Sequence, residues 1–302
     1  MWYNKCIVVK EKKKYTFIDL FAGIGGFHTA FHNLGAECVF VSEWDDAARQ
    51  TYKANYQKIS PKIFEDEEHL FVGDITKVDA KDIPDFDILT GGFPCQPFSQ
   101  AGLKKGFNET RGTLFFDVAR IIQEKQPRAF FLENVRGLLT HDNGKTFETI
   151  KKVLTEELGY SLHYKIIKAS DYGVPQHRPR LYMVGFKNKN TPYEFPEPIP
   201  LKMTMSDVWG GHVDKKIGFT LRVGGRHSGV NDRRNWDCYI VDGVEKCMSP
   251  KEGLRMQGFP DSFIFPVSET QAMKQLGNSV AVPAIQATAK NIIEALQNED
   301  LQ

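Results

Sequence analysis

The stretch Tyr15-Thr16-Phe17-Ile18-Asp19-Leu20-Phe21-Ala22-Gly23-Ile24-Gly25-Gly26-Phe27 decides the fold, because an apolar run passes through a glycine-rich turn into a helical pattern. The run over 15–20 predicts a buried strand. After the turn, apolar residues fall on one helical face as far as Leu34, and Gly35 supplies a stop. The glycines let a ligand approach the backbone at a helix N-terminus, so the turn predicts a nucleotide-type pocket.

The same alternation of strand-like and helix-like runs continues to residue 186. Helix-period stripes lie over 114–122 and 147–158. Further strand-like runs lie at 38–41, 70–72, 86–89, 129–132, 163–167 and 181–186. Alternating strands and helices are typical of βαβ units. We therefore expect an α/β fold with a Rossmann-like, doubly wound sheet.

The second part of the chain is organised differently. Four prolines within 191–200 predict a semi-rigid connector, and residues 201–248 combine glycine, arginine and aromatic residues with weak periodicity, as in a small loop-rich domain of short strands. Capping-box sequences at 249–252 and 268–271 then predict helices, and a last helix after Pro283 is expected to pack back onto the first domain. We thus expect domains at 1–190, 191–248 and 249–302.

Bulk composition sets further limits. The 302 residues suffice for one large and one small domain, and a net charge of +1 with a pI near 7.6 excludes a uniformly basic nucleic-acid binder. The five cysteines are odd in number and form no CxxC pair, which argues against a disulfide framework and a zinc site. We expect no metal, no membrane segment and a reducing cytoplasm.

Polar and aromatic side chains gather where the first three predicted strands end. Glu43, 20 residues after Gly23, can accept hydrogen bonds from ribose hydroxyls. Asp74 can reach an adenine amino group, and Phe21 can stack on the ring. The glycine spacing is GxGG, not GxGxxG, and no P-loop lysine is present. Although a glycine turn or a lone glutamate also occurs without a ligand, three converging strand ends favour S-adenosylmethionine, an adenosine without phosphates.

A second motif, Gly91-Gly92-Phe93-Pro94-Cys95-Gln96-Pro97-Phe98-Ser99, follows the strand-like run at 86–89. Cys95 lies just past a strand's carboxyl end, and the two flanking prolines restrict the backbone around it. A thiol held in this way suits a nucleophile, although a lone cysteine is more often a small buried hydrophobe.

These motifs, in this order, resemble the cytosine-C5 DNA methyltransferases of bacterial restriction-modification systems, over nearly the whole chain except 201–248. The resemblance also rests on Glu133-Asn134-Val135, on Gln176-His177-Arg178-Pro179-Arg180, and on closing motifs at 255–260 and 277–280. It implies the S-adenosylmethionine-dependent methyltransferase fold, S-adenosyl-L-methionine as cofactor, double-stranded DNA as substrate, a target-recognition domain, monomeric action, and a cognate restriction endonuclease as possible partner.

The resemblance implies five catalytic residues. Cys95 would add to C6 of a flipped-out cytosine, and Glu133 would protonate N3, which requires a raised pKa. Arg178 would favour the thiolate; with Arg180 it would hold the base carbonyl and a neighbouring anion, although an ion-pair edge looks similar. Asn134 would orient the base or cap the next turn. The implied cofactor contacts are Phe21, Gly23, Gly25, Glu43, Trp44, Asp74, Ile75, Asn278 and Val280.

Positive charge is concentrated between Lys215 and Arg234, where six lysines and arginines accompany one aspartate. Arginine takes phosphates or guanine edges, although a solvated basic face has the same composition. By resemblance, Thr220-Leu221 matches the paired Thr-Leu of target-recognition regions, and 222–236 is similar to those of enzymes modifying GG-x-CC sites. The residues 99–111 are either a loop that closes over the base or a plain surface loop. The expected DNA contacts are Gln96, Ser99, Thr220, Leu221, Arg222, Arg226, Arg233 and Arg234.

Three other functions fit the sequence less well. Cytosine-C5 methylation of tRNA uses the same fold, but the Cys-Phe-Thr signature of that branch is absent. A non-catalytic DNA-binding relative is disfavoured by the joint presence of Cys95, Glu133, Arg178 and Arg180. A nicotinamide oxidoreductase is disfavoured by the missing GxGxxG.

Overall fold

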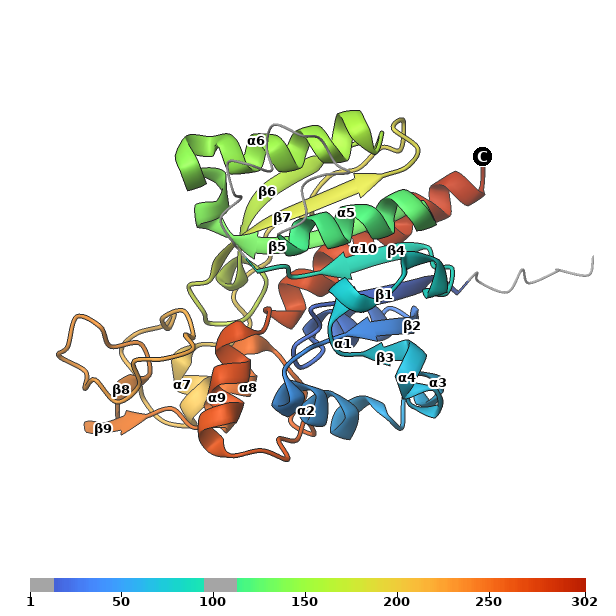
Figure 1. Cartoon of the computed structure of the whole chain (residues 1–302). Helices are drawn as coiled ribbons and strands as arrows, with labels where there is room; N and C mark the ends of the chain where they lie inside the picture. Colours follow the sequence, from blue (N-terminus) through green and yellow to red (C-terminus); the bar gives the residue numbers. More distant parts are fainter. Residues whose placement is uncertain (1–13, 95–112) are drawn as a thin grey trace, which may run out of the picture.

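A seven-stranded sheet in the order β3-β2-β1-β4-β5-β7-β6 forms the centre of the molecule (Figure 1). The computed structural model describes residues 14–94 and 113–302. The strands are β1 (Thr16–Leu20), β2 (Glu37–Ser42), β3 (Phe71–Val72), β4 (Ile88–Gly91), β5 (Ala129–Val135), β6 (His163–Lys168) and β7 (Pro179–Phe186). Each predicted strand is confirmed, with β4 beginning and ending two residues later than expected.

Strand direction differs from the simple βαβ expectation at one edge. Strands β1 to β5 pair in parallel, but β7 is antiparallel to both β5 and β6. The connection from β6 to β7 contains only the one-turn helix η6 (Ala169–Asp171). A parallel crossover requires a dozen or more residues, usually with a helix, so this short connection returns the chain antiparallel.

Helices cover both faces of the sheet (Figure 1), which confirms the doubly wound α/β architecture. Phe17 of β1 packs with α1 and α10 on one face, whereas Ile18 and Leu20 pack with α5 and α6 on the other, because successive strand residues point to opposite sides. Helix α10 lies against α1. The helices of this part are α1 (Gly26–His32), α2 (Asp46–Tyr56), α3 (Pro61–Glu65), α4 (Glu67–Leu70), α5 (Leu114–Lys125), α6 (Lys145–Lys152) and α10 (Val282–Asp300).

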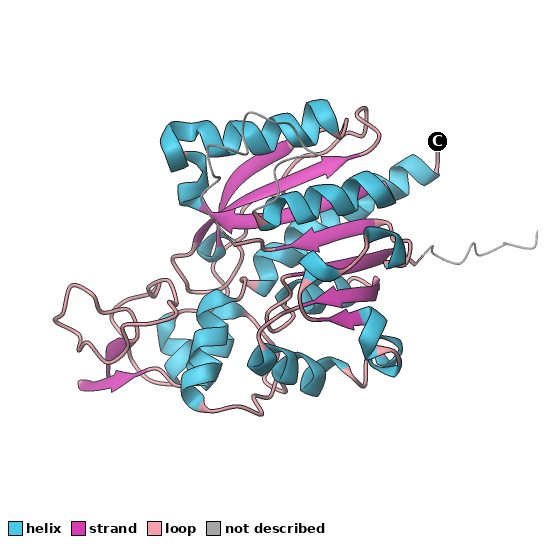
Figure 2. Cartoon of the chain, in the orientation of Figure 1, coloured by secondary structure: helices cyan, strands magenta, loops and turns pink. Residues whose placement is uncertain are grey.

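The remaining part is dominated by loops, as Figure 2 shows. It contains the hairpin β8 (Cys238–Val241) and β9 (Val244–Cys247) and the helices α7 (Met205–Trp209), α8 (Pro250–Gln257) and α9 (Glu269–Asn278). Both predicted helix starts are confirmed. Ser249 and Glu252 form the complete reciprocal capping box at α8, whereas at α9 Ser268 accepts a hydrogen bond from the Gln271 backbone.

The structure joins Cys238 to Cys247 in a disulfide, which the cysteine count did not predict. The antiparallel register of β8 and β9 places the two residues directly opposite each other, with their Cα atoms 3.9 Å apart. Cysteines nine residues apart carry no such signal until the hairpin forms. Cysteine usage therefore no longer supports a reducing compartment. Across 14–94 and 113–302, no helix has the length and apolar character to cross a bilayer.

Candidate active site

A cavity of about 1130 Å³ lies at the carboxyl ends of β3, β2, β1 and β4. The carboxyl ends of parallel strands meet at one edge of a sheet, and ligands of open α/β sheets bind there. Helices α5 and α9 complete the walls, through residues that include Leu114, Phe116, Arg120, Lys274, Gln275 and Asn278. Along the sheet the floor consists of Asp74 to Thr76 after β3, Glu43 to Asp45 after β2, Phe21 and Gly23 after β1, and Gly92 and Pro94 after β4.

The glycine-rich turn after β1 has the backbone that its sequence demands. Gly23 and Gly25 have φ of 56° and 82°, and a Cβ added to Gly25 would lie 2.3 Å from the Tyr56 ring. The Tyr56 hydroxyl donates a hydrogen bond to the Gly25 carbonyl at 2.6 Å. Phe21 also has a positive φ, of 55°, which is uncommon for a residue other than glycine and costs free energy. The turn therefore holds the Phe21 side chain at the cavity in a strained conformation.

Glu43 fastens two strand ends together. Its Oε2 accepts a hydrogen bond from the Gly23 backbone at 2.7 Å, and its Oε1 accepts one from Asp45 at 2.8 Å. Burial raises the pKa of this carboxyl, and the backbone hydrogen bonds partly oppose that rise. A carboxylate has about four acceptor positions, so capacity for ligand hydroxyls remains. Beside it, Trp44 is 79% exposed at the cavity wall, an unusual position for an indole.

Asp74 lies at the β3 end of the cavity. Its Oδ1 accepts hydrogen bonds from the backbone and hydroxyl of Thr76, at 3.1 and 2.7 Å, which lower its pKa. Arg120 of α5 donates to the carbonyls of Ile75 and, at 2.8 Å, Val78, and so holds this turn. The structure thus brings Phe21, Gly23, Glu43, Trp44, Asp74, Ile75 and Asn278 to one cavity. Gly25 lies just behind it, and buried Val280 packs where Gly26 begins α1.

Glu133 at the end of β5 is buried, with 8% of its surface exposed. Its Oε1 lies 3.0 Å from Nε of Arg180. Burial raises the pKa of the Glu133 carboxyl, while the charges of Arg180 and Arg178 lower it by less. This is the direction that proton donation to a base requires.

Asn134 holds the segment that leads out of β4. Its Nδ2 donates to the Phe93 carbonyl at 2.9 Å, and its Oδ1 accepts from the Val135 backbone at 2.8 Å. Both ends of the amide therefore serve the protein backbone. A Cβ on Gly92 would lie 3.5 Å from Oε2 of Glu133, so this segment passes close to the carboxyl. Cys95, Gln96, Ser99 and the loop at 99–111 lie outside the described residues.

Arg178 and Arg180 have different partners, although they are only two residues apart. The buried guanidinium of Arg178 donates to the carbonyls of Leu221 at 3.2 Å, Gly277 at 3.1 Å and Ser279. Arg178 therefore joins β7 to the loop-rich part and to the end of α9, whereas Arg180 faces Glu133. The role of Arg178 toward the Cys95 thiolate stays a prediction.

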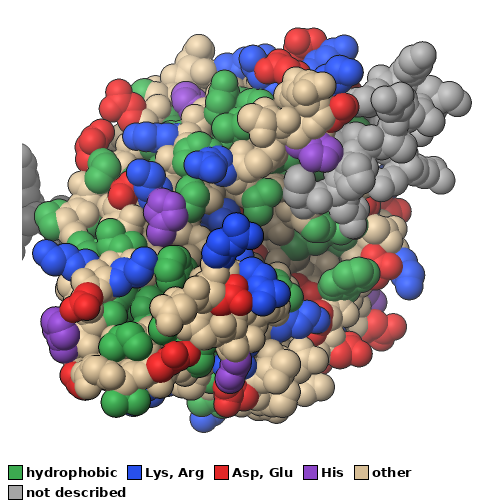
Figure 3. Space-filling model, turned by 90° about the vertical axis from the view of Figure 1, so that its left-hand side faces the viewer, with side chains coloured by type: hydrophobic (Ala, Val, Ile, Leu, Met, Phe, Trp, Pro, Cys, Tyr) green, Lys and Arg blue, Asp and Glu red, His purple; other side chains and the backbone are tan. Residues whose placement is uncertain are grey.

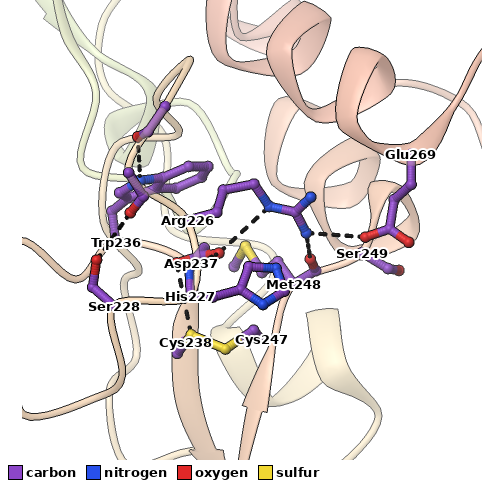
Figure 4. A network of polar contacts seen from close by, with 12 residues as sticks. Arg226, His227, Ser228, Trp236, Asp237, Cys238, Cys247, Met248, Ser249 and Glu269 are labelled. Carbon is purple, nitrogen blue, oxygen red and sulfur yellow. Dashed lines mark hydrogen bonds and ion pairs between the residues drawn. A yellow bond between two sulfur atoms is a disulfide. The ribbon is translucent and has the colours of Figure 1, made fainter.

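The predicted DNA contacts fall into two groups. Leu221 is buried, and Thr220 donates to the His177 carbonyl, so both fasten the start of the segment 222–236 to the loop before β7. Arg226 is also engaged internally: it donates to Met248 at 2.7 Å and Glu269 at 3.0 Å, and its Nε lies 3.5 Å from the fully buried Asp237 (Figure 4). The exposed side chains are those of Arg222, Arg233 and Arg234.

The exposed arginines belong to a mixed surface. Figure 3, which views the molecule from this side, shows several Lys and Arg side chains gathered towards the middle of the face, among apolar and acidic ones. Arg234 is 81% exposed and forms an ion pair with Asp232 at 2.8 Å. Such an exposed pair contributes little stability, so the arginine remains available to another anion.

Arg120, Lys274 and Gln275 are among the cavity residues that sequence reasoning missed. Arg120 carries no motif, and its role depends on two carbonyls in another segment. Lys274, paired with Asp45 at 3.2 Å, and Gln275 precede Asn278 by four and three residues. Positions three and four apart share a helix face, so the spacing before the closing motif was the available signal.

The chain is similar to known DNA methylases over most of its length. A family model described as C-5 cytosine-specific DNA methylase matches residues 15–220 and 211–294. Type II methyltransferase M.SsoII of Shigella sonnei is 47% identical over 95% of this chain and 82% of its own length. Type II methyltransferase M.HpaII of Haemophilus parainfluenzae is 44% identical over 95% and 91%.

Solved structures agree on the fold. The S. pombe Dnmt2 methyltransferase superposes with a TM-score of 0.70, covering 96% of this chain and 100% of that one at 21% identity. A Spodoptera frugiperda DNMT2 mutant gives 0.69, over 93% and 100%, at 19% identity. At these identities the likeness concerns the fold alone.

Proposed function

Since the chain belongs to the C-5 cytosine-specific DNA methylase family, we propose how it acts as a DNA cytosine-C5 methyltransferase: it transfers the methyl group of S-adenosylmethionine to C5 of a cytosine flipped out of duplex DNA, through a covalent bond from Cys95 to C6. The observation that carries this proposal is Glu133, a buried carboxyl with a raised pKa beside the segment that leads through Gly92 and Pro94 to Cys95.

The cavity at the strand ends fits the cofactor. Its volume is slightly above the roughly 300–1,000 Å³ usual for small-molecule sites. It offers an aromatic ring at Phe21 and acceptors at Glu43 and Asp74. S-adenosylmethionine, when bound, supplies an electrophilic methyl group.

The protein's own groups make C5 reactive. The Cys95 thiolate gives an electron pair to C6, and Glu133 donates a proton or hydrogen bond to N3, so that the ring becomes an enamine with a nucleophilic C5. The Arg180 guanidinium holds the Glu133 carboxyl and lies where it can bind the base carbonyl. After C5 has gained the methyl group, loss of the C5 proton, departure of the Cys95 thiolate and return of the N3 proton to the Glu133 carboxylate restore the aromatic ring.

A cytosine within a duplex is out of reach of these groups, so the base must leave the stack, at a cost of a few kcal/mol. The exposed Arg222, Arg233 and Arg234 would recover part of that cost through phosphates and base edges. We place the enzyme in the cytoplasm because its substrate is DNA, and we expect it to act as a monomer. A cognate restriction endonuclease would be its partner, which the named type II relatives support.

Bisulfite sequencing tests the proposal. Unmethylated plasmid DNA is incubated with the protein and S-adenosylmethionine, with Cys95→Ser as control. Protected cytosines within one short recurring sequence, absent from the control, are the expected result, and the same reads decide whether that sequence is GG-x-CC. If no cytosine is protected, DNA methylation is refuted, and incubation with tRNA then tests the rival substrate.

A further inference from the structure

We propose that Cys238 and Cys247 form a thiol–disulfide exchange site, whose oxidation state sets how firmly the segment 222–236 is held. The consequence for DNA binding rests on the proposed function. The disulfide joins the two strands β8 and β9. Cys238 is only 1% exposed, whereas Cys247 is partly exposed. A small-molecule thiol such as glutathione therefore has access to the bond through Cys247.

The compartment makes exchange the expected behaviour of this bond. Disulfides in the cytoplasm, where we place a protein that acts on DNA, usually open and close. A small thiolate attacks Sγ of Cys247 to form a mixed disulfide, while Sγ of Cys238 leaves and takes up a proton. A second small thiolate attacks the small-molecule sulfur and frees the Cys247 thiol. In total, one protein disulfide and two small thiols become two protein thiols and one small-molecule disulfide.

The fully buried Asp237 couples the sulfur of Cys238 to the segment 222–236 (Figure 4). Its carboxylate accepts hydrogen bonds from the His227 backbone at 3.1 and 3.2 Å and lies 3.5 Å from Nε of Arg226. Sγ of Cys238 lies 3.7 Å from Oδ1 of the same carboxylate. A disulfide sulfur has no proton to donate, whereas a reduced thiol is a donor. Reduction thus adds a donor that competes with His227 and Arg226 for Asp237.

Two further contacts connect the cross-linked ends of the hairpin to this segment. Oδ1 of Asn235 accepts from the Cys238 backbone at 2.9 Å, and its Nδ2 donates to the Cys238 carbonyl at 2.8 Å. Beside Cys247, the Met248 carbonyl accepts from Arg226 at 2.7 Å. The cross-link therefore restrains anchors of the segment on both strands. Because a restrained segment presents its exposed arginines in one arrangement, the oxidised form should bind DNA more tightly.

The exchange itself is tested in Cys95→Ser, so that oxidation of the proposed nucleophile does not enter the result. The protein is equilibrated in mixtures of reduced and oxidised glutathione, and free thiols are blocked with N-ethylmaleimide in denaturant. Trypsin cuts after Lys246, between the two cysteines, so the disulfide joins two peptides that mass spectrometry detects. We expect the joined pair to replace the blocked peptides as the oxidised share rises. A pair that never joins, or that stays joined in excess reduced glutathione, overturns the proposal.

Limited proteolysis of the folded protein measures how firmly the segment is held. Its exposed arginines are trypsin sites, at Arg222, Arg233 and Arg234. Samples of the reduced and the oxidised form are freed of glutathione and digested briefly. Cleavage at these sites should be faster in the reduced form, because local opening exposes them. Equal cleavage rates would show that the disulfide does not hold the segment.

Two variants in the same background locate the effect. Joint replacement Cys238→Ser and Cys247→Ser removes the exchange but keeps a donor beside Asp237, so it should behave as the reduced form in every mixture. Cys38→Ala, at a buried cysteine of β2 outside the hairpin, is the matched control and should respond to glutathione as its parent does. A response of the double serine variant to glutathione would place the effect elsewhere and refute the inference.

Gel shifts measure the consequence for DNA, with a duplex that contains the sequence protected in the bisulfite reads. We expect reduction to weaken binding about fivefold or more, and the duplex to shift the glutathione ratio at half oxidation by the same factor, because such coupling is reciprocal. Equal affinities of the two forms would overturn the inference. The peptide and proteolysis measurements need no DNA, so a protein that exchanges its disulfide but protects no cytosine would refute the proposed function alone.

Discussion

Replacing Arg178 with methionine should cost more stability than the same change at Arg180. Arg178 is only 3% exposed, and its guanidinium donates to three backbone carbonyls that come from two distant segments. Methionine retains most of the apolar stem but none of the donors. The carbonyl of Ser279 keeps a second donor, Nε2 of Gln257 at 3.3 Å. The variant therefore leaves two carbonyls, those of Leu221 and Gly277, without a described partner.

The size of the effect follows from that count. Each buried polar group left without a hydrogen bond costs about 1–3 kcal/mol, so two give about 2–6 kcal/mol. Removing a buried charge recovers some of its desolvation cost, which moves the expectation to the lower half of that range. Even so, the loss is a large share of the 5–15 kcal/mol by which a typical domain is stable.

Urea denaturation followed by circular dichroism measures this loss. Arg180→Met is the matched comparison, because within 14–94 and 113–302 that side chain has one ion pair, with Glu133, and one hydrogen bond, to the Pro179 carbonyl at 2.9 Å. We expect Arg178→Met to be the less stable of the two. A free energy of unfolding within about 0.5 kcal/mol of wild type, the range of ordinary surface substitutions, would refute the reasoning.

Three further outcomes are expected. Gly277→Ala places a Cβ 2.5 Å from the Arg222 carbonyl, which is backbone and cannot rotate away, so it should cost about 1–3 kcal/mol and weaken DNA binding in a gel-shift assay; an unchanged affinity would contradict this. Because burial raises the pKa of Glu133, its proton stabilises the folded state at pH values below the unfolded pKa, and that contribution is lost as the pH rises through the folded pKa. The value of kcat/KM should fall over the same pH range, and Glu133→Gln should remove this fall. A kcat/KM that rises over this range would disprove the assignment. Ser249→Ala removes the α8 cap and should lower the free energy of unfolding by about 0.5–2 kcal/mol, seen as a lower urea midpoint; no shift would show that the cap is redundant.

Much of the fold could be predicted because its signals are local. The apolar run ending at Leu20, the glycine turn and the helical stripe after it each depend on neighbours in the sequence, and the structure places β1, the turn and α1 accordingly. The direction of β7 could not be read in this way, since it depends on the length of the connection from β6. The Cys238–Cys247 disulfide likewise depends on the register of a hairpin.

The site residues also differ in whether local sequence signals could predict their neighbours. Phe21, Glu43 and Asp74 each follow a parallel strand, and parallel strands bring their carboxyl ends together whatever the loops do. Sequence reasoning could therefore group them. The partners of Arg178 could not be predicted, because its neighbours at 221 and 277 meet it only after α9 has folded back. A motif gives the residue type, whereas tertiary packing decides whether a guanidinium faces a carboxyl or a row of carbonyls.

Helix α9 explains why the cavity and the segment 222–236, which we propose reads the DNA, lie so close together. One face of it supplies Gln275 and Asn278 to the cavity, while the carbonyl of Gly277 takes the Arg178 guanidinium and a Cβ built on Gly277 would lie 2.5 Å from the backbone of Arg222. A side chain at 277 would occupy the space of that backbone, so glycine is what allows one helix to serve both sides. The exposed Arg222 is thus positioned by the same helix that forms a wall of the cavity. The segment 222–236 packs against the part of the chain that forms the cavity, so a change in its placement would also disturb the cavity.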